Sequence, residues 1–144
     1  MDQDIEDMRT RFLYEEFDET SFEVDADNIC GYAKACGEQD PRFTDPSHHD
    51  FQASPTYVST LAGERWLPDE FPRPEGVGMD AGKAVEWKAP IRAGTTLTGK
   101  SYVHDIYTKT GRSGRMIFVI TRMELVDDEG IHVANADTSS VFKE

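Results

Sequence analysis

The second half of the sequence is dominated by four runs of residues that favour β-strands. They are rich in Val, Ile, Thr, Tyr and Phe and cover residues 84–88, 95–108, 116–126 and 131–142. Two of the gaps, residues 111–114 and 127–130, contain the glycines typical of hairpin turns. Pro90 and the Ala93-Gly94 turn are expected to join the first two strands. The chain therefore favours an antiparallel sheet in which consecutive strands are neighbours.

Two helices are expected ahead of these strands, after a first strand around Phe22. Asp27 is expected to cap a short helix that Gly37 ends in the left-handed conformation. A second helix is expected to open at Pro55 and to finish at Pro68. Its stripe at helical spacing consists of Thr56, Tyr57, Val58, Leu61, Ala62 and Trp66. This second helix is the candidate for a buried central helix.

The predicted elements indicate an α+β fold. The length of 144 residues suits one domain. One face of the sheet is expected to pack on the central helix, and a second layer or a partner subunit would cover the other. Residues 1–20 are interpreted as an acidic N-terminal extension, in which Ile5, Met8 and Phe12 have the spacing of a short amphipathic helix. Residues 21–144 form the predicted domain.

The charge distribution restricts the partners of the chain. The net charge is −13, and residues 1–30 alone carry eleven Asp or Glu against two Arg. Nucleic acid and anionic membranes are disfavoured because both require a basic surface. The sequence has no apolar run of membrane-spanning length, so a cytoplasmic protein is expected. No group of His, Cys and carboxylates has the spacing of a metal site, so no metal is expected.

The segment after the first helix carries the most specific signal. It reads Gly37-Glu38-Gln39-Asp40-Pro41-Arg42-Phe43. This run resembles the Gly-Asp-x-Asn-Pro-x-His motif of MaoC-like (R)-specific enoyl-CoA hydratases and dehydratases. Gly37 and Pro41 match, Glu38 and Asp40 are chemically close, and Phe43 stands where the motif has His. The run resembles more closely the degenerate, FAS1-like dehydratase or MaoC N-terminal half of that superfamily.

The resemblance implies a hotdog fold, an antiparallel sheet wrapped around a central helix, that works in homo- or heterodimers. It also implies a lyase acting on an acyl-thioester such as acyl-CoA in fatty acid or lipid metabolism, without a cofactor. In the catalytic members an Asp and a His share the proton transfers, and N–H groups at a helix start hold the thioester oxygen. Here Glu38 could replace the Asp, but Phe43 cannot carry a proton and Pro55 has no N–H. The chain is therefore interpreted as the substrate-binding subunit of a hydratase/dehydratase with a catalytic hotdog partner.

Two other functions are consistent with the sequence. A self-sufficient homomeric dehydratase would use Glu38 or Asp40 with His48 or His49, and the candidate catalytic set is Glu38, Asp40 and His49. A non-enzymatic scaffold would bind the acyl-thioester without turnover. The acyl carrier is coenzyme A or acyl carrier protein, and the acidic surface disfavours the second because carrier proteins are themselves acidic.

Candidate substrate-binding residues come from two parts of the chain. Those expected near the acyl group are Phe43, Ser54, Thr56, Tyr57 and Leu61. Those expected to meet the phosphates of coenzyme A are Lys109, Arg112 and Arg115, with Arg92 ahead of another turn.

Overall fold

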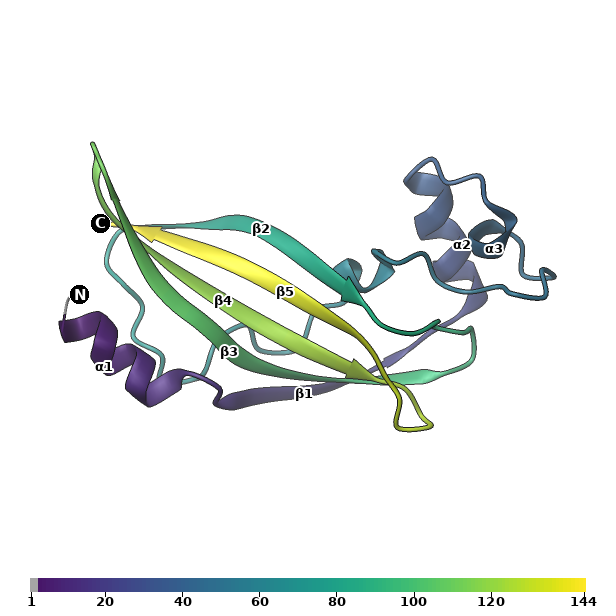
Figure 1. Cartoon of the computed structure of the whole chain (residues 1–144), viewed down its shortest axis with the longest axis horizontal. Coiled ribbons are helices and arrows are strands. Elements are labelled where there is room, and N and C mark those ends of the chain that lie inside the picture. Colours follow the sequence, from purple (N-terminus) through teal and green to yellow (C-terminus); the bar gives the residue numbers. More distant parts are fainter. Residues whose placement is uncertain (1–2) are drawn as a thin grey trace.

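A computed structural model describes residues 3–144, which form one antiparallel sheet with helices at its two ends (Figure 1). In chain order the elements are α1 (Gln3–Phe12), β1 (Glu16–Glu23), α2 (Ala26–Ala35), α3 (Pro41–Thr44), the 3-10 turn η1 (Tyr57–Thr60), β2 (Val77–Trp87), β3 (Thr96–Gly111), β4 (Gly114–Val126) and β5 (His132–Lys143). All the predicted strands are present, although β2 begins well before the predicted residue 84. None of the described helices is long and apolar enough to cross a membrane.

The strand order in the sheet is β1-β3-β4-β5-β2. The two predicted hairpins, β3–β4 and β4–β5, are confirmed. The expectation that the first two of the four strands are neighbours is wrong, because β2 pairs with β5. After β2, Ala89 still donates to Val133, and the chain then leaves the sheet at Pro90. Gly94 N next bonds to Val24 O, so this connection crosses to the other edge before β3 begins.

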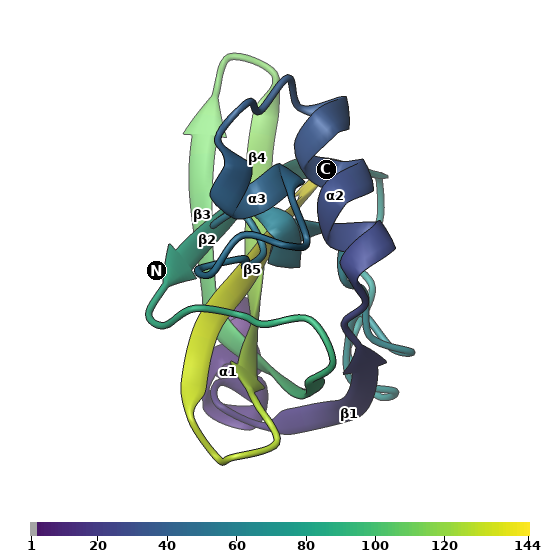
Figure 2. The same cartoon turned by 90° about the vertical axis from the view of Figure 1, so that its right-hand side faces the viewer.

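Two apolar clusters pack on the sheet. The first joins α2 and η1 to the sheet and includes Ile29, Val58, Leu97 and Leu125, each with none of its surface exposed. The second lies at the other end, where α1 and the segment around residues 67–71 pack over Ile106 and other strand residues. Figure 2 shows α2 and α3 together at the end of the sheet that carries the first cluster. The first cluster therefore fixes the helix that precedes the acidic loop.

Helix α2 is capped by Asp25, not by the predicted Asp27. The Asp25 carboxylate accepts a 2.7 Å hydrogen bond from Asn28 N, whereas Asp27 lies inside the first turn. The predicted stop is confirmed: Gly37 has φ +77°. Gly37 N bonds to Lys34 O and the next amide to Ala33 O, which is the Schellman arrangement. The backbone thus leaves the helix in a fixed direction.

Two glycines of this helix are expected to respond oppositely to alanine. Gly31 lies inside α2 with open space around its Cα, so Gly31→Ala should raise the free energy of unfolding by about 0.5–1 kcal/mol. Gly37 also has open space, but its positive φ disfavours a Cβ, so Gly37→Ala should lower the free energy of unfolding by about 1–2 kcal/mol. Urea unfolding of both variants measures this. Equal signs would contradict the assignment of Gly37 as a left-handed cap.

The predicted central helix over residues 56–66 is wrong in its length. Only the four residues of η1 are helical, and Leu61 already has extended backbone. Two hydrogen bonds to β1 hold the following segment: Glu64 N donates to the Thr20 hydroxyl, and Arg65 Nη1 donates to Phe17 O. The bond from Glu64 N takes the place of a helical backbone hydrogen bond, and the Arg65 side chain ties the segment to the edge strand. Tyr57 and Val58 are buried as predicted, while Trp66 is 52% exposed.

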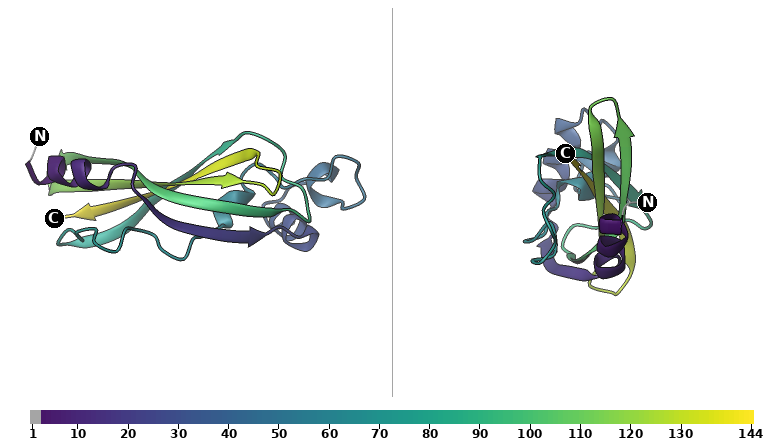
Figure 3. Two further views of the ribbon diagram at one scale, coloured as in Figure 1. Left: turned by 90° about the horizontal axis from the view of Figure 1, so that it is seen from below. Right: turned by 90° about the vertical axis from the view of Figure 1, so that its left-hand side faces the viewer.

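The N-terminal helix is confirmed. Ile5 and Phe12 are buried in the second cluster and Met8 packs against it. Helix α1 lies along β3 beyond the end of β1, and Leu13 bridges to Val103 (Figure 3). Strand β1 spans the expected boundary between the extension and the domain, and that division stays a prediction. Residues 1–2 of the extension lie outside the described residues.

Candidate functional site

The acidic loop, residues 37–40, lies between α2 and α3 at one end of the sheet (Figure 2). Helix α3 has only four residues, with Pro41 in its first turn. Asp40 caps it by accepting a 3.0 Å hydrogen bond from Arg42 N. The local sequence therefore explains the geometry, since Asp before Pro is a strong helix start.

Glu38 closes the acidic loop on itself. One carboxylate oxygen, Oε1, accepts hydrogen bonds from both Gln39 N and Asp40 N, each 3.0 Å long. A carboxylate that accepts two backbone N–H groups acts as a structural acceptor. Its second oxygen, Oε2, is the one left for a ligand or a water.

Asp40 is bound by a neighbouring guanidinium. Arg42 Nε and Nη2 donate to Asp40 Oδ2 at 3.1 and 2.8 Å. These side-chain hydrogen bonds, followed by the backbone N–H of Arg42, lower the pKa of Asp40 below its ordinary value of 3.8. Asp40 is therefore ionised at neutral pH and has no proton to donate. A general acid at neutral pH requires a pKa much closer to 7.

The ion pair of Asp40 should make the start of α3 sensitive to acid. Because the folded pKa lies below the unfolded value, the contribution of Asp40 to stability is complete above about pH 4 and is lost as the pH falls through the folded pKa. NMR titration of the carboxyl carbons measures this. In Arg42→Met, which keeps the backbone N–H, we expect the Asp40 midpoint to rise. The midpoint of Asp45 serves as the internal control, because hydrogen bonds from Ser47 lower the pKa of Asp45.

Phe43 is an anchor for this loop. Its side chain is 9% exposed, and the Arg42 guanidinium lies 5.1 Å from the ring centroid. Phe43 N donates to Asp40 O within α3. A phenyl ring has no group that can donate or accept a proton. The loop therefore has no acid or base at the position where the MaoC-like motif has its histidine.

The two loop histidines follow α3. The rings of His48 and His49 stack with centroids 4.5 Å apart. His48 Nδ1 accepts a hydrogen bond from Asp50 N, which puts the proton of a neutral ring on Nε2. Arg92 pairs with Asp50 at 2.8 Å and also donates to the Phe51 carbonyl. This arginine, which precedes the predicted turn, is brought to the loop. The structure places His49 on the surface.

The segment ahead of η1 combines buried and exposed polar groups. Ser54 is 8% exposed, and its hydroxyl has no hydrogen-bond partner among residues 3–144. Thr56 Oγ1 lies 2.7 Å from the Tyr32 hydroxyl. Tyr57 packs edge-to-face against Tyr32 at 5.8 Å, and burial raises the pKa of its phenol. These contacts join α2 to the segment ahead of η1.

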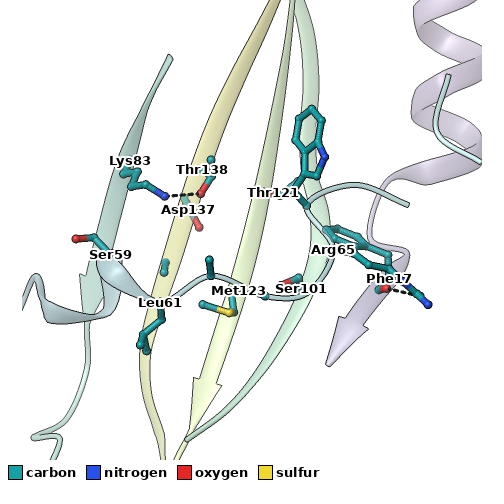
Figure 4. Close-up of a pocket in the computed structure, with 14 residues that line it drawn as sticks. Phe17, Ser59, Leu61, Arg65, Lys83, Ser101, Thr121, Met123, Asp137 and Thr138 are labelled. Atoms are coloured by element: carbon teal, nitrogen blue, oxygen red, sulfur yellow. Dashed lines mark hydrogen bonds between the residues drawn. The ribbon is translucent and has the colours of Figure 1, made fainter. Parts of the chain in front are cut away.

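A cavity of about 170 Å³ lies behind η1, on the face of the sheet where the central helix was predicted (Figure 4). Its lining combines apolar and polar side chains from η1, the segment after it and five strands. The lining residues are Phe17, Ser59, Leu61, Ala62, Gly63, Arg65, Trp66, Lys83, Ser101, Thr121, Met123, Ala136, Asp137 and Thr138. Of the predicted substrate residues, Leu61 lines this cavity.

The strand residues of the cavity were not identified from the sequence. Ser101, Thr121 and Thr138 each come from a different strand and share one face of the sheet. The sequence offered no separate signal for them, because the residues on either side of them are of mixed polarity and the strand register decides which small polar residues face one another.

The predicted phosphate-binding cations lie elsewhere. Lys109, Arg112 and Arg115 belong to the β3–β4 hairpin region at the end of the sheet opposite α2 and α3 (Figure 1). Arg115 binds the carboxylates of Asp4 and Glu144 at 2.9 and 2.7 Å. Within one chain they are not brought to the acidic loop, and their role in coenzyme A binding stays a prediction. Among the described residues no group of His, Cys, Asp and Glu has the geometry to hold a metal.

Comparisons with known proteins identify a family and a fold. The family model for the FAS1-like, dehydratase domain region matches residues 12–136. A UPF0336 protein of Streptomyces avermitilis is 28% identical over 134 residues, which is 85% of each chain. The MaoC-like dehydratase from Rhodospirillum rubrum matches with a TM-score of 0.60 at 20% identity, over 92% of this chain and 93% of that one.

A heteromeric structure also matches. It is the HadBC (3R-hydroxyacyl-ACP dehydratase) complex from Mycobacterium tuberculosis, with a TM-score of 0.63 at 22% identity over 85% of this chain and 90% of the other. At these identities the likeness concerns the fold, and it confirms the predicted α+β hotdog class.

Proposed function

Since the chain belongs to the FAS1-like dehydratase domain family, we propose that it is the substrate-binding subunit of a heteromeric (R)-specific enoyl-thioester hydratase/dehydratase. A second hotdog chain would supply the catalytic acid and base. The observation that carries the proposal is the buried Phe43 at the motif's histidine position, beside carboxylates that are committed to capping their own loop.

The reaction defines what this chain lacks. Hydration joins a hydroxyl oxygen to C3 of the enoyl thioester and a proton to C2, so it needs a base for water, an acid for C2 and donors for the thioester oxygen. Asp40 is held ionised by Arg42, and Glu38 accepts two loop amides. Pro55, two residues ahead of η1, has no N–H. What remains for this chain is to bind and orient the acyl group.

The shortened helix supports a role in acyl binding. A full central helix would fill the sheet face that here carries the cavity behind η1. Leu61, Trp66 and Met123 give this cavity an apolar part. An acyl chain whose thioester lies near the acidic loop would pass η1 and enter it. The position of the cavity thus matches a subunit that accommodates a bulky acyl group.

Strand β2 offers an edge for the partner. Among residues 3–144 it pairs with β5 alone, and its other edge has no neighbouring strand in the sheet. Val77, Met79 and Trp87 expose 65, 48 and 45% of their surfaces along it. The opposite edge is different, because α1 lies along β3 and Arg65 bonds to β1. A long, apolar and uncovered edge strand is a preferred site of association, so we place the catalytic partner on β2.

The test is enoyl-CoA hydration by the purified chain, alone and with the hotdog chain that co-purifies with it from the native host. We expect no turnover alone and clear turnover with the partner. In the reconstituted pair, Glu38→Gln and Asp40→Asn should change kcat by no more than about threefold. Turnover by the chain alone that Asp40→Asn abolishes would overturn the proposal.

The hydrogen bonding of His48 is the observation that favours the self-sufficient dehydratase, because it fixes one ring nitrogen of a loop histidine that follows α3. With Nδ1 occupied by Asp50 N, His48 Nε2 would face the substrate. Under this alternative, His48→Ala would abolish turnover by the chain alone and His49→Ala would not. If the chain binds acyl-CoA but shows no turnover, either alone or with any partner, the non-enzymatic scaffold is the function that remains.

A further inference from the structure

We propose that the cavity behind η1 takes the distal part of an acyl chain that carries an oxygen acceptor, most favourably a carboxylate. Lys83 would bind this oxygen where β2 and β5 border the cavity, and the hydroxyls of Thr121 and Ser101 line the cavity on β4 and β3. The inference rests on the proposed function and names the class of acyl group. A purely aliphatic or aromatic tail would not satisfy these three groups.

The hydroxyls come from neighbouring strands. In the sheet register Ser101 lies opposite Met123 and Thr121 lies opposite Val103, so all four belong to the face that bears the cavity. Ser101 is 7% exposed. Within residues 3–144 neither hydroxyl takes part in a hydrogen bond. An alkyl segment would displace water from both and return no hydrogen bond, which disfavours it.

Lys83 supplies a positive charge. It comes from β2, and its ammonium lies 3.4 Å from the Thr138 hydroxyl, toward which it points in Figure 4. In the part of the chain that the structure describes, no carboxylate lies within ion-pair distance of it. Lys88 and Lys100, by contrast, pair with Glu86 and Glu19. An ammonium without a carboxylate partner is a site for an acceptor oxygen, and a charge-assisted hydrogen bond is the stronger kind.

The nearby carboxylates do not neutralise Lys83. Asp137 is bound by Arg122 through two hydrogen bonds of 2.8 and 2.9 Å. Asp18, which is in close contact with Gly63, accepts a hydrogen bond from the Thr20 hydroxyl. Lys83 therefore keeps an exposed ammonium without an ion-pair partner among the described residues, in a protein whose net charge is −13.

The size of the cavity limits what it holds. Its volume of about 170 Å³ is close to that of an engineered cavity of about 150 Å³ that binds benzene. It therefore takes a segment of about six heavy atoms. Leu61, Trp66 and Met123 suit the hydrocarbon part of such a segment, and Lys83 suits its oxygen end. The predicted ligand is an acyl group with an apolar stem and a polar terminus.

Calorimetric titration tests this with saturated acyl-CoA probes, which are not turned over. Unsubstituted acyl-CoA and its ω-carboxyl counterpart are compared at six, ten and fourteen carbons, on the chain and on its co-purified complex. At the length that reaches the cavity, the ω-carboxyl probe should bind about tenfold more tightly. Lys83→Met should remove this preference and leave the Kd of the unsubstituted probe within about twofold. Lys100→Met, which removes an equal charge elsewhere, should keep the preference.

The outcomes separate the two proposals. If unsubstituted probes bind and no ω-carboxyl probe binds more tightly at any length, the inference about the cavity is wrong and the substrate-binding role stands. If the preference persists in Lys83→Met, the assignment of Lys83 is wrong. If neither the chain nor the complex binds any probe, the proposed function itself fails. Thermal unfolding of each variant verifies that it is folded.

Discussion

Replacement of Ile29 by alanine is expected to lower the free energy of unfolding by about 2–4 kcal/mol. Ile29 lies in α2 with none of its surface exposed, in the cluster that joins the helix to Leu97 and Leu125 of the sheet. Removing three side-chain carbons loses their burial and leaves a void that the sheet cannot fill by moving. Urea unfolding followed by circular dichroism measures the effect.

The matched control is Ile131→Ala. Ile131 is 46% exposed beside the β4–β5 turn, so the same change there should alter the free energy of unfolding by no more than about 0.5 kcal/mol. Ile29→Val should fall between, at about 0.5–1.5 kcal/mol. Because α2 ends in the acidic loop, faster amide exchange at residues 37–44 is expected in Ile29→Ala. Equal effects of the two alanine variants would contradict the packing of α2 on the sheet.

The double substitution Met79→Glu and Trp87→Glu is expected to weaken association with the catalytic partner by at least about 100-fold. Both side chains lie on β2 and are about half exposed in the single chain. If a partner covers this edge, each new carboxylate would be buried without a counterion, which costs several kcal/mol. Sedimentation equilibrium of the chain with its co-purified partner measures the dissociation constant, and hydration activity should fall in parallel.

Ile131→Glu provides the control for charge and exposure. Ile131 is exposed to nearly the same extent as Met79 and Trp87 but lies outside β2. It should leave the dissociation constant within about threefold, and none of the three substitutions should change stability greatly because these side chains are partly solvated in the single chain. If the β2 variant binds the partner as tightly as the unchanged chain, the partner interface lies elsewhere.

The sequence carries no signal for the length of the helix that begins near Thr56. Residues 56–66 have apolar side chains at helical spacing, yet the helix stops after Thr60. Periodicity reports which side chains face an apolar surface, and Tyr57 and Val58 do so. It does not report that the Thr20 hydroxyl of β1 competes with a helical carbonyl for Glu64 N, or that Phe17 O binds the Arg65 side chain. The site depends on this outcome, because the cavity lies where a longer helix would be.

The candidate site divides in the same way. Residues 37–43 predict the acidic loop, its proline and the absence of an acid or base at Phe43, because caps and turns depend on immediate neighbours. The ion pair of Asp40 with Arg42 is also local. The pairing of Arg92 with Asp50 and the separation of Lys109 from the loop involve distant segments, and only the folded chain reveals them.

The sequence by itself determined the strands, the hairpins, the helix stop at Gly37 and the identity of the loop residues. These depend on side-chain periodicity and on backbone preferences that act within a few residues. The tertiary structure alone decided that β2 pairs with β5, that the central helix is reduced to η1, and that Lys83, Ser101 and Thr121 share one cavity. These depend on strand order and register, which the packing of residues far apart in the chain selects.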